Sequence, residues 1–165
     1  MKKNIIFVSN TAEEEQSIVD RFHDSVDFFK RHQIRFNMPR RAILEEYDSS
    51  LYEAYRAVAE ADWANRSENF IEKLRLFFQR PEPFQFIVRI TQYGPFGFYD
   101  FKDQSVTINR HANIDAFRII QHEMIHVMVE PYILAQKLKH SQKEFIVESL
   151  GTMFASIDSI SDPGK

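Results

Sequence analysis

The segment from residue 115 to residue 130 constrains the fold of this chain more than any other part of the sequence. Its apolar side chains recur with helical spacing and continue around most of the circumference, at Phe117, Ile119, Ile120, Met124, Ile125, Val127, Met128 and Val129. A helix that is apolar on nearly every side is buried. His122 and His126 interrupt the apolar surface, and because buried imidazoles need partners, we expect both to line an interior cleft.

The two histidines belong to the pattern His122-Glu123-Met124-Ile125-His126. Side chains four residues apart in a helix lie one turn apart on the same face, so two ring nitrogens can reach one zinc ion at about 2.0–2.1 Å. Zinc lowers the pKa of bound water towards about 7, and a neighbouring carboxylate can then take the proton as the water attacks a carbonyl carbon. The pattern predicts one Zn²⁺ ion held by His122 and His126, with Glu123 as the general base.

Such a site needs a third protein ligand, and three residues downstream offer one. His140 lies among polar residues, which indicates exposure. Glu144 lies in the first turn of a helix expected at 141–157, where the helix dipole favours a carboxylate in any case. Glu148 lies in the middle of that helix among apolar residues, where an unpaired carboxylate is costly. We therefore expect Glu148 to be the third metal ligand, with Glu144 as a partner that orients a ligand.

The order of the expected elements indicates an α+β fold. Short strands and amphipathic helices are expected in the first half of the chain, at residues 5–8, 11–32, 33–38 and, as two helical pieces, 40–79. After the breaker at 80–83, three strands and two helices follow, at 84–91, 98–101, 105–109, 115–130 and 141–157. Pro131 is expected to end the first of these two helices.

The stretch from Phe98 to Ala155 resembles the catalytic core of the zincin metallopeptidases, and within them the gluzincins, whose third zinc ligand is a Glu on a later helix. The residues 122–126 match the HExxH signature of that family one by one. Residues 97–101 and 105–109 resemble the edge strand and the strand that precede the active-site helix. Glu148-Ser149-Leu150-Gly151 resembles the start of the glutamate motif.

The resemblance implies a zincin-like fold, and together with the expected elements it predicts N-terminal helices and a small mixed sheet that has an antiparallel edge strand. It also implies hydrolysis of peptide bonds, with a peptide or protein substrate lying along the edge strand at 97–101. Members of the family often use a His or Tyr to stabilise the oxyanion, and here Tyr132 and His140 are both candidates. The metzincin branch is excluded, because it needs Gly and His where this chain has Val129 and Tyr132.

Two other functions compete with a peptidase. One is a catalytically inactive binding or regulatory protein with the zincin fold, which the unassigned oxyanion donor leaves open. The other is a helical structural domain without a metal, in which the HExxH pattern would be accidental. Metal analysis separates the last from the first two, and a peptidase assay with and without a chelator separates the first two from each other.

Composition limits the kinds of protein to which the chain can belong. The chain has 165 residues, of which 44% are hydrophobic, and this suits a single domain spanning residues 1–165. A net charge of -3 gives no electrostatic basis for binding nucleic acid or a membrane surface. The chain contains no Cys, so histidines and carboxylates must supply any metal ligands. The apolar run Ile5–Val8 is too short for a signal segment, and we expect a cytoplasmic protein.

Overall fold

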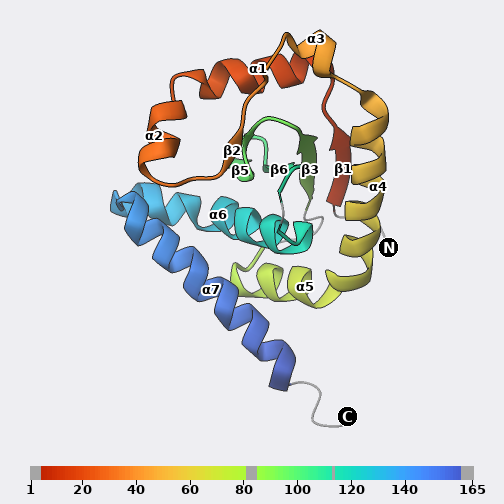
Figure 1. Cartoon of the computed structure of the whole chain (residues 1–165). Coiled ribbons are helices and arrows are strands. Elements are labelled where there is room, and N and C mark those ends of the chain that lie inside the picture. Colours follow the sequence, from red (N-terminus) through yellow and green to blue (C-terminus); the bar gives the residue numbers. More distant parts are fainter. Residues whose placement is uncertain (1–4, 81–84, 113, 161–165) are drawn as a thin grey trace.

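A small mixed sheet lies at the centre of the molecule (Figure 1). The computed structural model describes residues 5–80, 85–112 and 114–160. Within these residues the sheet has four strands in the order β1-β3-β6-β5, namely Ile5–Ser9, Phe86–Thr91, Ser105–Asn109 and Gly97–Asp100. β1, β3 and β6 are parallel, and β5 runs antiparallel to β6 at the edge. A second pair, β2 (Phe36–Asn37) and β4 (Gly94–Pro95), is antiparallel.

The residue types in each strand match how deeply that strand is buried. Every residue of β6 is buried, as is typical of a strand with neighbours on both sides and helices above it. β3 alternates between buried and half-buried positions and contributes the fully buried Val88 and Ile90 to the core. β5 has no buried residue. Its side chains therefore line a partly open surface beside the core.

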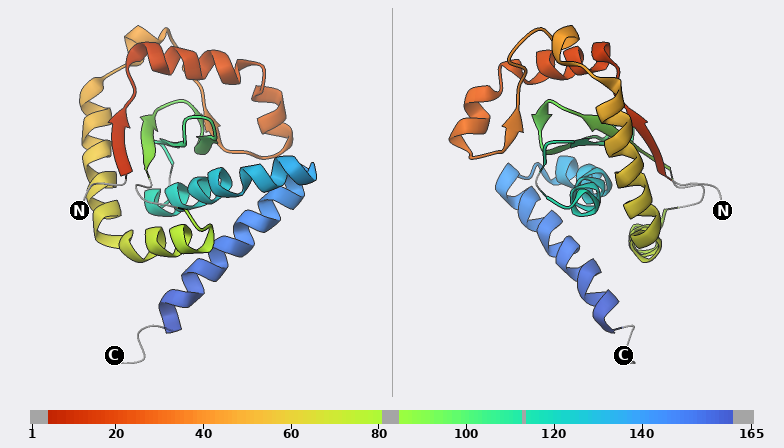
Figure 2. Two further views of the ribbon diagram at one scale, coloured as in Figure 1. Left: turned by 180° about the vertical axis from the view of Figure 1, so that it is seen from behind. Right: turned by 45° about the vertical axis from the view of Figure 1, so that its right-hand side comes forward.

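The helices surround the sheet in two groups (Figure 2). The first group comprises α1 to α5, at Ala12–His23, Val26–Arg31, Ile43–Glu46, Ser49–Arg66 and Glu68–Phe77. Thr11 caps α1 in a capping box with Glu14, which fixes where that helix begins. The second group comprises α6 (Ala116–Gln136) and α7 (His140–Ile160). α6 contacts β5 and β6, and the two long helices diverge towards the end of α7 (Figures 1 and 2).

The core forms where α6 meets the sheet and α4. Ile120 and Met124 are fully buried, and they belong to a cluster that includes Tyr52 of α4 and Val88 of β3. Eleven residues of α6 are buried, so the expectation of a helix that is buried on most sides is confirmed. No helix in the described residues is long and apolar enough to cross a membrane.

The α+β class and the antiparallel edge strand are confirmed, but several boundaries differ from expectation. The helix expected at 11–32 is broken at Asp24-Ser25, and the region 40–79 forms three helices instead of two. Residues 81–84 of the expected breaker and strand lie outside the described part of the chain.

The prediction that Pro131 ends α6 was wrong, because the helix continues to Gln136. A proline removes one backbone hydrogen bond from a helix. The following turn is stabilised by packing instead, since Ile133 is only 5% exposed and belongs to the main core. α6 ends at Lys137, whose left-handed backbone (φ 51°) stops the helix.

Candidate metal centre

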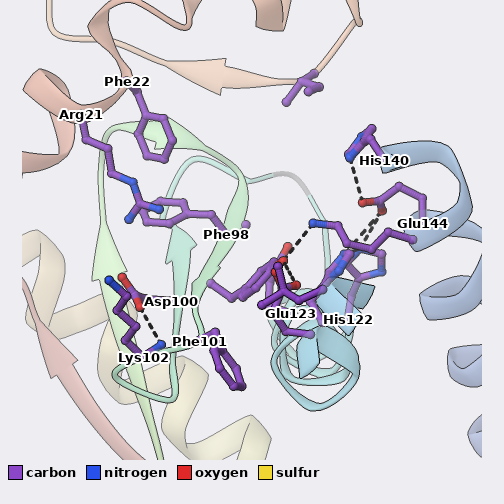
Figure 3. Close-up of a pocket in the computed structure, with 17 residues that line it drawn as sticks. Arg21, Phe22, Phe98, Asp100, Phe101, Lys102, His122, Glu123, His140 and Glu144 are labelled. Atoms are coloured by element: carbon purple, nitrogen blue, oxygen red, sulfur yellow. Dashed lines mark hydrogen bonds and ion pairs between the residues drawn. The ribbon is translucent and has the colours of Figure 1, made fainter. Parts of the chain in front are cut away.

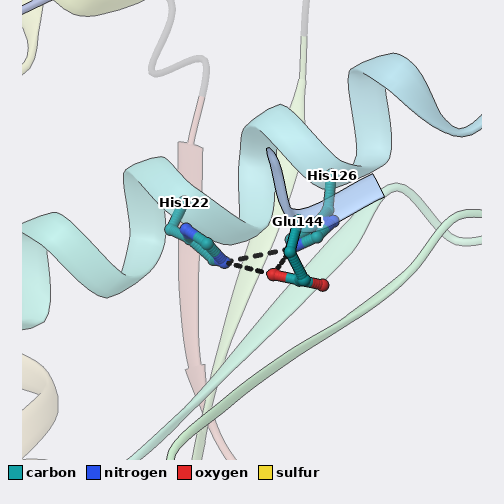
Figure 4. A group of neighbouring side chains, drawn as sticks. All are labelled: His122, His126 and Glu144. Atoms are coloured by element: carbon teal, nitrogen blue, oxygen red, sulfur yellow. Dashed lines mark hydrogen bonds and ion pairs between the residues drawn. The ribbon is translucent and has the colours of Figure 1, made fainter. Parts of the chain in front are cut away.

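Helix α6 presents the side chains of the HExxH pattern, His122, Glu123 and His126, on two of its faces. Glu123, His126 and Glu130 follow one another at helical spacing and form the face that lies against β5. His122 and His126 share the face that lies against the N-terminal part of α7, where Glu144 reaches both rings (Figure 4). His126 therefore lies between the edge strand and α7.

The three donor atoms are separated by distances close to those between the ligands of a tetrahedral metal. The Nε2 atoms of His122 and His126 are 3.0 Å apart. Oε2 of Glu144 lies 3.6 Å from the first and 3.4 Å from the second of these nitrogens. Tetrahedral ligands at about 2.0–2.1 Å from zinc are about 3.3 Å from one another, a distance fixed by that geometry alone. His122, His126 and Glu144 form a group of donors that could hold one ion.

The carboxylate that the structure brings to the histidines is that of Glu144, whereas we expected that of Glu148. The reasoning for Glu148 assumed a buried position, but its side chain is exposed. Only three residues separate α6 from α7, so the N-terminal part of α7 stays close to α6 before the two helices diverge (Figure 1). Glu148 lies one turn further along and acts on His122 only as one of the charges that raise the pKa of its ring.

The pKa values of this group reflect a balance between burial and mutual attraction. Burial lowers the pKa of His122, but the nearby carboxylates, Glu144 first, outweigh it and the net pKa is raised. The more deeply buried His126 has a lowered pKa, because burial dominates there. The pKa of Glu144 is well below its ordinary range, since the two imidazoles outweigh its burial. A carboxylate that stays ionised and a neutral His126 are the forms that bind metal.

Glu123 lies beside the donors without joining them. Its side chain is buried, and among the described residues no hydrogen bond restrains its carboxylate. Burial raises its pKa to about 7, an effect that the charge of His122 only partly offsets. A pKa near neutrality suits a group that must first accept and then release a proton.

Gly97 makes room for this carboxylate. A Cβ atom at that position would lie 2.6 Å from Oε1 of Glu123 and 2.6 Å from a methyl group of Ile119. Any larger residue would push Glu123 away from the edge strand or the strand away from α6. The sequence carries one signal for Gly97, namely its place in a strand next to the expected catalytic helix, and this signal was missed.

The donors open into a cleft of about 730 Å³ (Figure 3). One wall is β5, the floor is α6, and α1 contributes Arg21 and Phe22 to the rim. Of the two candidates for oxyanion stabilisation, His140 lines this cleft, and its Nδ1 lies 3.5 Å from Oε1 of Glu144. Tyr132 is 56% exposed and is not among the lining residues. The geometry therefore favours His140 over Tyr132.

A polar cluster that the sequence did not indicate joins three elements next to the donors. The Tyr99 hydroxyl donates to Oε2 of Glu130 at 2.6 Å and accepts from Nζ of Lys143 at 2.9 Å. The Tyr99 ring is stacked on the His126 ring, with centroids 5.0 Å apart and planes 5° from parallel. Burial and the charge of Glu130 raise the pKa of Tyr99, so the hydroxyl keeps its proton.

Comparison with known proteins adds no name to this geometry. No protein-family model, no curated protein and no solved structure matches the chain. The function is therefore argued from the site itself.

Proposed function

We propose that this chain is a zinc-dependent peptidase of the gluzincin type. The observation that carries the proposal is the convergence of His122, His126 and Glu144 close to tetrahedral spacing, in the lining of a cleft and beside a buried carboxylate. Two histidines, one carboxylate and an open fourth position are the donor set of catalytic zinc in peptidases. The arrangement of α6, α7 and the edge strand supports the finer assignment to a zincin-like fold.

The side chains divide the chemistry among them. Zinc, when bound, acidifies water and polarises a carbonyl group. Glu123 takes the proton of the attacking water on its carboxylate and delivers it to the nitrogen of the leaving amine. His140, which lines the cleft, would donate a hydrogen bond to the oxygen that becomes negatively charged.

β5 supplies the surface for the substrate. Among the described residues β5 pairs only with β6, so its other side offers backbone donors and acceptors to an extended peptide. Gly97 to Asp100 all line the cleft. A peptide added to this edge would lie in the cleft that the donors on α6 also line, and this would bring a peptide carbonyl near a bound ion.

The decisive experiment combines turnover with metal content. Purified protein loaded with zinc should cleave unstructured polypeptide chains, lose activity on treatment with a chelator, and regain activity when zinc is restored. Glu123→Gln should retain zinc and lose turnover, which excludes a contaminating peptidase. Zinc bound at one ion per chain without any turnover would instead support the inactive binding protein. Absence of stoichiometric metal would contradict the proposal.

A further inference from the structure

The His126 ring lacks the interaction that ordinarily orients a metal-binding histidine. When one ring nitrogen binds a metal, the other usually donates to a carboxylate or a carbonyl, which fixes the ring plane and its tautomer. Here Nε2 faces the other donors, while Nδ1 is buried and has no hydrogen-bond partner among the described residues. The His126 side chain is nevertheless only 4% exposed, so the surrounding side chains restrict its position.

Tyr99 lies where it can fix the orientation of the His126 imidazole. Its ring lies parallel to that of His126 at stacking distance, which defines the imidazole plane from one side. β5 explains this placement, since alternate residues of a strand point to the same face. Gly97 and Tyr99 both face α6, the first opposite Glu123 and the second opposite His126.

The Tyr99 hydroxyl extends this contact to α7. It is the common partner of Glu130 on α6 and Lys143 on α7, and the Lys143 ammonium also lies 5.1 Å from the centre of the Tyr99 ring. Lys143 directly precedes Glu144 in the chain. The hydroxyl thus restrains the helical turn that carries the third donor.

We infer that Tyr99 is the positioning residue of the metal centre, with its ring orienting His126 and its hydroxyl fixing the turn that carries Glu144. This inference rests on the proposed function. It also gives the edge strand a second role, because the strand that would take the substrate also holds two of the three donors in place. A peptide that pairs with β5 can then act on the metal geometry through Tyr99.

The test measures metal affinity, with no need for turnover. Zinc affinity is determined by competition with a chromophoric chelator, and Co²⁺ substituted for zinc reports the donor geometry through its visible absorption. Tyr99→Leu removes the stack and the hydroxyl and should weaken zinc binding by about 10–100-fold, the usual effect of losing an orienting partner. Its Co²⁺ spectrum should change in position and intensity.

Two further variants isolate the hydroxyl and keep the inference testable if Tyr99→Leu does not fold. Tyr99→Phe and Lys143→Met should each weaken zinc binding by a similar factor of up to about tenfold. Because both break the same link, the double variant should bind no more weakly than either single variant. Tyr132→Phe, an exposed tyrosine on α6 outside the cleft, is the matched control and should bind zinc like the wild type.

The outcomes separate this inference from the proposed function. A wild-type chain that binds no zinc contradicts the proposed function itself. A wild-type chain that binds zinc, together with folded Tyr99 variants of unchanged affinity and unchanged Co²⁺ spectrum, overturns the role of Tyr99 alone. Independent, additive effects of Tyr99→Phe and Lys143→Met overturn the link between β5 and α7.

Discussion

Two buried glutamates of this molecule, Glu15 and Glu123, have opposite surroundings. The Glu15 side chain is fully buried, and it accepts hydrogen bonds from the Asn10 amide at 2.8 Å, the Tyr52 hydroxyl at 3.0 Å and the Gln92 backbone N–H at 3.0 Å. Glu123 is 8% exposed, and no hydrogen bond from another described residue reaches its carboxylate.

The difference separates a carboxylate that hydrogen bonds hold in place from one that we propose to be reactive. Glu15 ties α1 to the ends of β1 and β3 and to α4, and every one of its contacts would be lost if it moved. Glu123 is held by packing alone, against Gly97 and beside two histidines. A buried carboxylate without donors is costly to folding, and its retention next to a cleft points to use in chemistry.

The largest effect is expected at Glu15. Glu15→Ala leaves the Tyr52 hydroxyl and the Gln92 N–H without their acceptor, and each such buried group costs about 1–3 kcal/mol. We expect the free energy of unfolding to fall by about 3 kcal/mol or more, measured by urea denaturation. Glu15→Gln keeps one acceptor and should cost less. Little change in the free energy of unfolding of either variant would show that the hydrogen bonds of Glu15 do not stabilise the fold.

Glu123→Gln should show the reverse pattern. No hydrogen bond is lost, so the free energy of unfolding should stay within about 1 kcal/mol of the wild type. Turnover should fall by a factor on the order of 10² or more, because the amide cannot accept the proton. Denaturation and peptidase assays on the same preparation test both parts. A strongly destabilised variant with normal turnover per folded molecule would make Glu123 a structural residue like Glu15.

Gly97→Ala should move the Glu123 carboxylate without replacing it. The added methyl group would collide with the Glu123 carboxylate, and we expect turnover to fall about tenfold or more, as small misplacements of reacting groups do. Gly151→Ala in α7 is the matched control, since its Cβ would meet only an ordinary contact at 3.9 Å. The control should retain turnover. Equal losses in both variants would contradict the role assigned to Gly97.

The smallest effect concerns Glu46, another carboxylate with several donors. The Tyr93 hydroxyl, helped by the backbone N–H groups of Arg40 and Arg41, lowers the pKa of Glu46 below its ordinary 4.5 and outweighs burial. Its stabilisation is therefore present above pH 4.5 and is lost as the pH falls through the lowered pKa.

Glu46→Gln should accordingly be less stable than the wild type at pH 7, by under about 1 kcal/mol, and the difference should vanish in acid. Urea denaturation of both proteins at a series of pH values measures this. A difference that grows as the pH falls would reverse the sign and contradict the assignment.

The part of the fold that follows from hydrophobic periodicity was predictable from the sequence. The apolar surface of α6 and the alternation in β3 indicated a buried helix over a small sheet, and both are confirmed. The passage of α6 through Pro131 was not predictable from local propensity, because tertiary packing of Ile133 decides it. Local patterns also missed the break between α1 and α2.

Some residues of the candidate site were likewise predictable from the sequence, and others were not. Helical spacing alone placed His122 and His126 together, since both belong to one helix. The choice between Glu144 and Glu148 depends on the angle between α6 and α7, which periodicity does not contain. The short connection between the helices was the missed signal, because it keeps the N-terminal part of α7, which carries Glu144, close to α6. Tyr99 and Lys143 meet only through the tertiary fold.

The most direct test of the central claim is the zinc stoichiometry and affinity of Glu144→Ala beside Glu148→Ala. Both variants lose one carboxylate from α7, one turn apart. If His122, His126 and Glu144 hold the ion, Glu144→Ala should lose stoichiometric zinc, while Glu148→Ala should retain it with an affinity reduced at most about 10–100-fold. Full zinc occupancy in Glu144→Ala, with loss of zinc in Glu148→Ala, would contradict the account.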